Sequence, residues 1–200
     1  GAWRDVLSLE PPPSPCPPPG DGELQVLVHS CGLAFPDVLT VEGKHIQKKQ
    51  PPFVPATEVA GIVTAVGKGV TEAYGFREGD RVFGTTNSGG LRKYTTIPAM
   101  GAYKLPEGVG MNVGAGFELN YGTTYHGLVD IARLREGETL LVLGASGGVG
   151  MAAIDIGVAL GATVVACAST PAKLEVCEKA GATTLINYTE GNFKQALKDA

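Results

Sequence analysis

The chain has 200 residues, 44% of them hydrophobic and 18% charged, which is enough for one hydrophobic core or two modest ones. Its formal net charge is −4 and its isoelectric point lies near 5.4. This acidic balance argues against a nucleic-acid surface, because phosphates need a basic face, so nucleic acid is not an expected partner.

No apolar run approaches the roughly 20 residues that span a bilayer, and no signal-peptide core opens the chain. We therefore expect no membrane contact and an intracellular protein, in the cytoplasm or, alternatively, in the mitochondrion. The cysteines show no metal-ligand clustering, and reduced structural thiols are the expectation. They are Cys16, Cys31, Cys167 and Cys177.

Up to about residue 117 the chain is rich in turns and in strand-forming residues. Short runs bounded by Gly or Pro predict five strands, at residues 6–9, 24–29, 59–66, 81–83 and 94–97. Seven of the fourteen prolines lie within residues 11–19, and they predict an extended polyproline-type connector between the first two strands. A basic cluster in residues 44–49 is interpreted as a solvated loop.

The second part of the chain alternates strands with helices. Residues 139–161 predict a buried apolar strand, a glycine turn and a helix that begins at Gly148. Gly144, Gly147 and Gly150 allow a tight turn, a close backbone approach to phosphate and close packing of the helix on the sheet. Further strands at 162–168 and 183–186, with a helix at 171–180, complete a βαβαβ unit that binds a dinucleotide.

The end of the second of these strands indicates which dinucleotide. An NAD site places Asp or Glu about 20 residues after the glycine turn, but no acid lies between Asp155 and Glu175. Ser169, Thr170 and Lys173 occupy this region instead. Hydroxyls and an ammonium group suit a 2′-phosphate, which a carboxylate would repel, so the sequence predicts NADP(H) as the cofactor.

Six segments, in order over almost the full length, carry a family resemblance: residues 31–44, 52–70, 79–84, 121–128, 144–150 and 186–188. In these the chain resembles the medium-chain dehydrogenase/reductase superfamily and its zinc-free quinone oxidoreductase (zeta-crystallin-like) branch. The resemblance implies an α/β protein in which a GroES-like β-rich catalytic domain, residues 1–117, precedes a Rossmann domain, residues 118–200. We expect only the first half of that NADP(H)-binding domain here, with its C-terminal half missing.

The resemblance also implies cofactor contacts, in four groups. They are Phe35 and Asp37 beside the nicotinamide; Thr123 and His126 over the cofactor; Gly148 and Val149 at the pyrophosphate, beside Gly144, Gly147 and Gly150 of the turn already described; and Ser169, Lys173 and Tyr188 around the adenosine phosphate. The adenosine group agrees with the charge argument above.

The chain departs from the zinc-dependent relatives at two positions. Where they carry a Cys it has Ala34, and where they carry a His-Glu pair it has Thr57 and Glu58. Zinc needs several soft or imidazole ligands in one shell, so no metal is expected. Quinone-reductase relatives often carry Asn at the position of Ala34, and its loss affects the substrate assignment more than cofactor binding.

Without a metal to polarise a carbonyl, the accessible acceptors are electron-poor: quinones, or alkenes conjugated to a carbonyl. We therefore expect an NADPH-dependent, zinc-independent reductase that transfers hydride to such small molecules. Tyr121, Tyr125 or solvent could supply the proton, and no catalytic residue is assigned. The full-length parent is expected to be a homodimer, and this 200-residue piece alone to have little activity.

Two alternatives stay open: a 2-enoyl thioester reductase, and a non-enzymatic NADPH-binding or RNA-interacting protein of the crystallin type. The acidic balance speaks against the second. A short-chain dehydrogenase is excluded. Proteins of that family begin with the nucleotide motif, whereas here the motif comes late, at residues 144–150, and the Tyr-x-x-x-Lys pair of that family is absent from this sequence.

Overall fold

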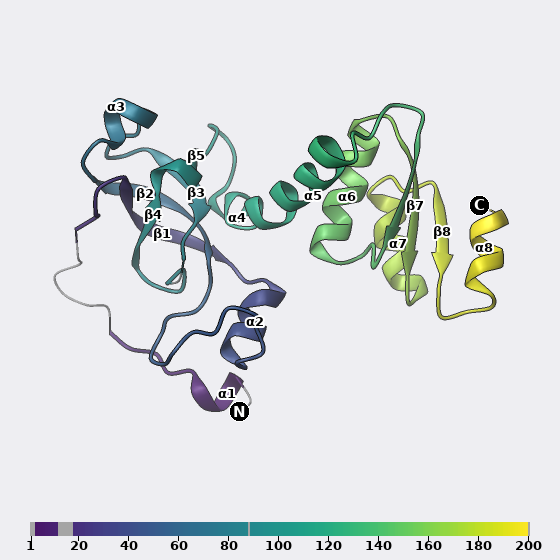
Figure 1. Cartoon of the computed structure of the whole chain (residues 1–200), viewed down its shortest axis with the longest axis horizontal. Helices are drawn as coiled ribbons and strands as arrows, with labels where there is room; N and C mark the ends of the chain where they lie inside the picture. Colours follow the sequence, from purple (N-terminus) through teal and green to yellow (C-terminus); the bar gives the residue numbers. More distant parts are fainter. Residues whose placement is uncertain (1–2, 12–17, 88, 200) are drawn as a thin grey trace. The chain divides into compact units, whose positions relative to one another are not determined.

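The structure is a computed structural model that describes residues 3–11, 18–87 and 89–199. The chain forms two compact units, Gly1–Leu119 and Asn120–Ala200. Figure 1 shows the β-rich first unit and the second unit, in which strands alternate with helices. Each unit has its own hydrophobic core and is described by itself.

The first unit is built on a five-stranded sheet in the order β4-β1-β2-β3-β5, with all neighbours antiparallel. Its strands are β1 (Glu23–Gly32), β2 (Glu58–Val66), β3 (Arg81–Thr85), β4 (Tyr94–Pro98) and β5 (Ala102–Lys104). Leu24, Val26, Val59, Val63 and Ile97 are at most 1% exposed and form the centre of the core. Leu24 and Val26 of β1, and Val59 and Val63 of β2, are each an even number of positions apart, so each strand turns these apolar side chains to one buried face.

Four of the five strands expected in this unit are confirmed, but the strand at residues 6–9 is wrong. Trp3–Val6 is a short helix, α1, and no strand follows it in residues 7–11. Leu7 and Leu9 are exposed, so the apolar spacing there buries nothing. The polyproline connector cannot join two strands as expected, and most of it lies outside the described residues. β5 was missed because only Ala102 of its three residues is buried.

Short helices fill the connections of the first unit: α2 (Phe35–Val41), α3 (Val70–Tyr74), a 3₁₀ turn (Ala99–Gly101) and α4 (Met111–Gly114). The start of α2 is held by Asp37, whose carboxylate accepts the N–H of Ala34 at 2.9 Å. Pro36 in the first turn suits this helix start, because its missing N–H would have no helical partner there. The basic residues 44–49 form no helix or strand, as expected of a loop.

The second unit holds a parallel three-stranded sheet in the order β6-β7-β8. A helical stretch precedes the sheet. It consists of a π-helix at Glu118–Gly122, the short helix α5 (Thr123–Tyr125) and a second π-helix at His126–Ile131. The sheet part runs β6 (Thr139–Leu143), α6 (Gly148–Ala159), β7 (Thr163–Ala168), α7 (Pro171–Lys179), β8 (Thr184–Asn187) and α8 (Phe193–Asp199). The expected βαβαβ order is confirmed.

Helices cover both faces of this sheet (Figure 1). On one face Ile154 of α6 and Cys177 of α7 pack with Val142 and Val164, and on the other Phe193 of α8 packs against Ile186 and its neighbours. The expectation that β6 is buried throughout is wrong, because Leu141 is 43% and Leu143 63% exposed. Among the described residues β6 pairs only with β7, and only its Leu140 and Val142 side meets the helices.

Candidate cofactor site

The glycine turn between β6 and α6 has the backbone that its sequence predicts. Gly144 has a φ of +62°, a left-handed conformation that favours glycine. A Cβ at Gly150 would lie 2.6 Å from the carbonyl oxygen of Ala145, so the helix approaches the turn closely enough to require glycine there. Gly147 caps the helix with an extended backbone, and Gly148 and Val149 are exposed in its first turn. The first N–H groups of α6 have no partners within the helix, and exposed residues carry two of them, which suits an anion site.

A polar side chain that sequence reasoning missed lies against this turn. A Cβ at Gly148 would lie 2.6 Å from Oδ1 and 3.0 Å from Nδ2 of Asn120. A side chain at residue 148 would therefore displace the Asn120 amide, whereas the backbone sets no requirement for glycine, since Gly148 is not among the residues with positive φ. The sequence held no signal for this, because Asn120 and Gly148 are 28 positions apart.

The structure brings together the three residues predicted for the adenosine phosphate. The Lys173 Nζ donates to Ser169 Oγ at 3.0 Å, and both follow the carboxyl end of β7. Tyr188 lies next to them, since its backbone N–H donates to the carbonyl of Ala168 at 3.2 Å, and its side chain is 42% exposed. Thr170 caps α7 by accepting the N–H of Lys173. An ammonium group, a hydroxyl and a partly exposed phenol therefore lie at one edge of the sheet.

The two residues predicted over the cofactor are both exposed. Thr123 lies at the start of α5, and His126 Nδ1 lies 3.0 Å from Asp130 Oδ2 one turn further on. The neighbouring Thr124 is buried instead and donates its hydroxyl to the carbonyl of Val149 at 3.2 Å. This contact fixes α5 to the first turn of α6.

The two residues predicted beside the nicotinamide differ in exposure. Phe35 is 73% exposed at the start of α2, whereas Asp37 is only 8% exposed and its carboxylate is engaged with the Ala34 N–H. Phe35 thus offers an apolar ring to a ligand, and Asp37 holds the helix start that carries it. Their contact with a cofactor stays a prediction.

The two tyrosines that sequence analysis considered as a proton source differ in their surroundings. The Tyr121 hydroxyl donates to Asp155 Oδ2 of α6 at 2.8 Å. This hydrogen bond is the main reason that the pKa of Tyr121 is raised. Tyr125 is 53% exposed. Tyr121 therefore ties its segment to α6 and holds its proton in that contact.

The residues at the position of the zinc ligands in other family members do not fit a zinc ion. Ala34 and Thr57 supply no soft or imidazole ligand. The nearby Cys31 is half-buried, and burial, with Asp37 and Glu58 beside it, raises its pKa to about 11, so it is a thiol rather than the thiolate that zinc binds. Over residues 3–11, 18–87 and 89–199, no group of three or more His, Cys, Asp or Glu side chains is arranged to hold a metal.

A buried carboxyl pair in the first unit was also missed by sequence analysis. Glu58 is 3% exposed and accepts the N–H of Leu119 at 3.0 Å. Burial, then the nearby Glu58 charge, raises the pKa of Glu118 to about 7, although a hydrogen bond with Thr85 opposes this. Glu118 Oε2 is buried and has no hydrogen-bond partner within the described chain. The pair therefore binds a proton near neutral pH. No local sequence pattern predicts this raised pKa, because the two residues are far apart in the sequence.

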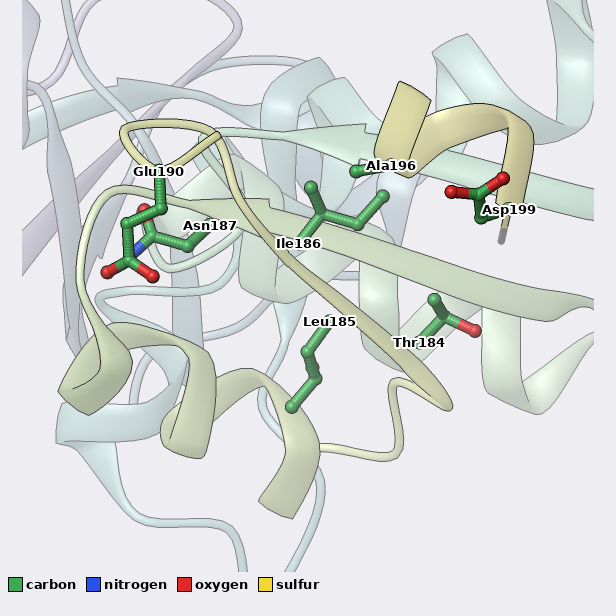
Figure 2. A pocket seen from close by; sticks show the side chains of 7 residues that line it. All are labelled: Thr184, Leu185, Ile186, Asn187, Glu190, Ala196 and Asp199. Atoms are coloured by element: carbon green, nitrogen blue, oxygen red, sulfur yellow. The ribbon is translucent and has the colours of Figure 1, made fainter. Parts of the chain in front are cut away.

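A separate shallow groove lies beside β8, between this strand and α8 (Figure 2). It is lined by Thr184, Leu185, Ile186, Asn187, Glu190, Ala196 and Asp199. None of the residues predicted to bind the cofactor lines it, so it is distinct from the glycine turn and from the contact of Lys173 with Ser169. None of the helices within the described ranges has the length and apolarity needed to cross a membrane.

A β-rich unit followed by a βαβαβ unit with a glycine turn before α6, and with the Lys173–Ser169 contact after β7, is the arrangement typical of two-domain, nucleotide-dependent dehydrogenases and reductases. Family comparisons agree with this class. Residues 20–107 match the alcohol dehydrogenase GroES-like domain, and residues 148–200 match the family described as zinc-binding dehydrogenase.

Individual relatives are quinone oxidoreductases and related proteins. The quinone oxidoreductase-like protein 2 homolog of Nematostella vectensis is 37% identical over 181 residues, which cover 90% of this chain and 49% of that protein. The crystal structure of Escherichia coli quinone oxidoreductase complexed with NADPH superposes with a TM-score of 0.87 at 30% identity, covering 100% of this chain and 59% of that one. The CurK enoyl reductase superposes with a TM-score of 0.79 at 28% identity, covering 89% and 55%.

These matches establish the family: the chain belongs to the medium-chain dehydrogenase/reductase superfamily, on its quinone oxidoreductase branch. The chain spans about half the length of the curated relatives that it matches.

Proposed function

We propose that the chain belongs to an NADPH-dependent reductase that works without zinc and transfers hydride to quinones or to alkenes conjugated to a carbonyl. The observation that carries this proposal is the contact of Lys173 with Ser169 at the end of β7, where an NAD-binding relative would place a carboxylate. A structural relative from Escherichia coli is a quinone oxidoreductase in complex with NADPH, which supports the same cofactor here.

When bound, NADPH supplies the hydride, and the residues of this chain bind and orient the cofactor. The N–H groups of the first turn of α6, which have no partners within the helix, suit the diphosphate, and Gly150 keeps that turn close to Ala145. The Lys173 ammonium and the Ser169 hydroxyl lie within hydrogen-bond distance of each other. They suit the 2′-phosphate, because the first supplies a positive charge and the second a hydrogen-bond donor. The exposed Phe35 offers an apolar surface to a flat acceptor.

Because Ala34 and Thr57 leave no zinc to polarise a carbonyl, the acceptor must be electron-poor by itself. Quinones and conjugated carbonyls meet this condition. A 2-enoyl thioester is the second candidate, because it is also a conjugated carbonyl and the CurK enoyl reductase has the same fold at 28% identity. Turnover of a 2-enoyl thioester without turnover of quinones, measured on the complete protein, would favour this alternative.

The cofactor part of the proposal is tested by binding. We expect NADPH to bind the chain more tightly than NADH, and Lys173→Ala to weaken NADPH binding about tenfold, the size of one charge-assisted hydrogen bond, with little effect on NADH. Isothermal titration calorimetry measures both constants.

Lys179→Ala is the matched control for this substitution. Lys179 lies on the same helix, but it pairs with Glu175 at 2.7 Å and is 72% exposed, so its loss should leave NADPH affinity unchanged. Tighter binding of NADH than of NADPH to the unsubstituted chain would contradict the proposal.

A further inference from the structure

The segment that opens the second unit is fixed to α6 at three places. The Tyr121 hydroxyl donates to Asp155, the Thr124 hydroxyl donates to the carbonyl of Val149, and the Asn120 amide lies against Gly148. Two of these contacts lie in the first turn of α6, which we propose binds the cofactor diphosphate. The position of Asn120 relative to that turn is therefore determined within one unit.

The contact at Gly148 involves the whole amide group. From a Cβ placed on Gly148, Oδ1 would lie at 2.6 Å, Cγ at 2.9 Å and Nδ2 at 3.0 Å. The three similar distances show that the carboxamide lies broadside against the helix start. A polar group with both a donor and an acceptor thus lies beside the first turn of α6, whose N–H groups have no partners within the helix.

The chemistry of this position favours a neutral amide. The turn carries the positive end of the α6 dipole, and the cap residue Gly147 has no side chain to satisfy it. In the absence of ligand a carboxylate would suit such a helix start better than an amide. When a diphosphate occupies the turn, the same carboxylate would repel it, whereas an amide can donate a hydrogen bond to it.

We propose that Asn120 is a positioning residue for the cofactor diphosphate, whose carboxamide forms one wall of the turn at Gly148. This inference rests on the proposed NADPH site. It predicts that the amide is needed for the diphosphate and not for the adenosine phosphate, because the latter is bound at Ser169 and Lys173.

The test compares two probes, NADPH and 2′-AMP, on the 200-residue chain. 2′-AMP carries the 2′-phosphate but no diphosphate. We expect Asn120→Asp to weaken NADPH binding about tenfold and to leave 2′-AMP binding within about twofold of the unsubstituted chain. Asn120→Leu, which keeps the branched shape but removes the donor, should also weaken NADPH binding selectively.

Gln195→Glu is the charge control. It makes the same amide-to-acid change on α8, which packs on the opposite face of the sheet from α6, so both affinities should stay unchanged. Thermal unfolding of the ligand-free variants shows whether each one folds. If both Asn120 variants fold and bind NADPH as tightly as the unsubstituted chain, Asn120 only packs against the turn, and the inference is overturned. Failure of 2′-AMP to bind the unsubstituted chain would instead contradict the proposed NADPH pocket itself.

Discussion

At the scale of single residues, neighbours in space decide what a side chain does. Ser169 and Lys173 are four positions apart at a strand end, and their contact could be predicted from that spacing together with the missing acid. Glu118 and Glu58 are 60 positions apart, and only the fold places one carboxyl beside the other in a buried environment. A contact between residues close in sequence at a predicted strand end can therefore be predicted from the sequence, whereas the burial of a carboxyl group beside a distant one cannot.

The Glu118 carboxyl predicts a pH dependence of stability. Its pKa is about 7 in the fold against an ordinary value of 4.5, so the folded chain binds this proton more tightly than the unfolded chain. The contribution of Glu118 to the free energy of unfolding therefore falls as the pH rises from 4.5 to about 7 and stays low above that. Glu118→Gln should remove this decline, which denaturant titrations at several pH values between these limits measure.

The exposed Glu107 provides the comparison for this prediction. The variant Glu107→Gln should show the same pH dependence as the unsubstituted chain, because that carboxyl lies at the surface. If Glu118→Gln and the unsubstituted chain lose stability in parallel over this range, the proton is not held at Glu118.

At the scale of elements, glycine conformations and close approaches explain why the βαβαβ unit could be predicted. Gly144 needs its left-handed backbone, and Gly150 needs the absence of a Cβ, and both requirements appear in the sequence as glycine. The short helix α2 was not predicted, because it depends on Asp37 accepting the N–H of Ala34 rather than on apolar periodicity. The strand predicted at residues 6–9 failed for the opposite reason, since its apolar residues find no sheet to join.

The close approach at Gly150 predicts a large effect of a small substitution. Gly150→Ala places a methyl group 2.6 Å from the Ala145 carbonyl oxygen and 2.7 Å from that of Gly144, both rigid backbone atoms. We expect a loss of about 1–3 kcal/mol in the free energy of unfolding, the range for overpacked sites, together with weaker NADPH binding. Chemical denaturation and calorimetry measure the two effects.

Gly127→Ala is the matched control in the same unit. Gly127 lies in a helical segment where an added Cβ meets nothing within 4 Å. Replacement there should stabilise the chain by up to about 1 kcal/mol, because alanine is the better helix former. Equal effects of the two substitutions would show that the turn at Gly150 can relax.

At the scale of the whole molecule, the chain is two units with separate cores. The β-rich core centres on Leu24, Val59 and Ile97, and the other on Val142, Ile154 and Val164. The residues proposed for the diphosphate and the adenosine phosphate all belong to the second unit. The exposed Phe35 belongs to the first unit.

This division predicts where NADPH protects the chain. Bound ligand stabilises the segments that it contacts, so amide hydrogen exchange should slow most in residues 144–150 and 168–173. Exchange in the central strands β1 and β2 of the first unit should change little. Hydrogen exchange with mass spectrometry resolves these segments, and protection centred on β1 and β2 instead would contradict the placement of the site.

The sequence by itself determined the order of elements in the second unit, the glycine turn, the cationic character after β7 and the lack of two zinc ligands. Each of these depends on residues near one another along the chain, where backbone conformation and local charge follow from residue type. Only the tertiary structure decided that Asn120 meets Gly148, that Glu58 and Glu118 share a buried environment, and that Leu141 and Leu143 of β6 are exposed. Those outcomes depend on which distant segments pack together, and packing acts through space rather than along the sequence.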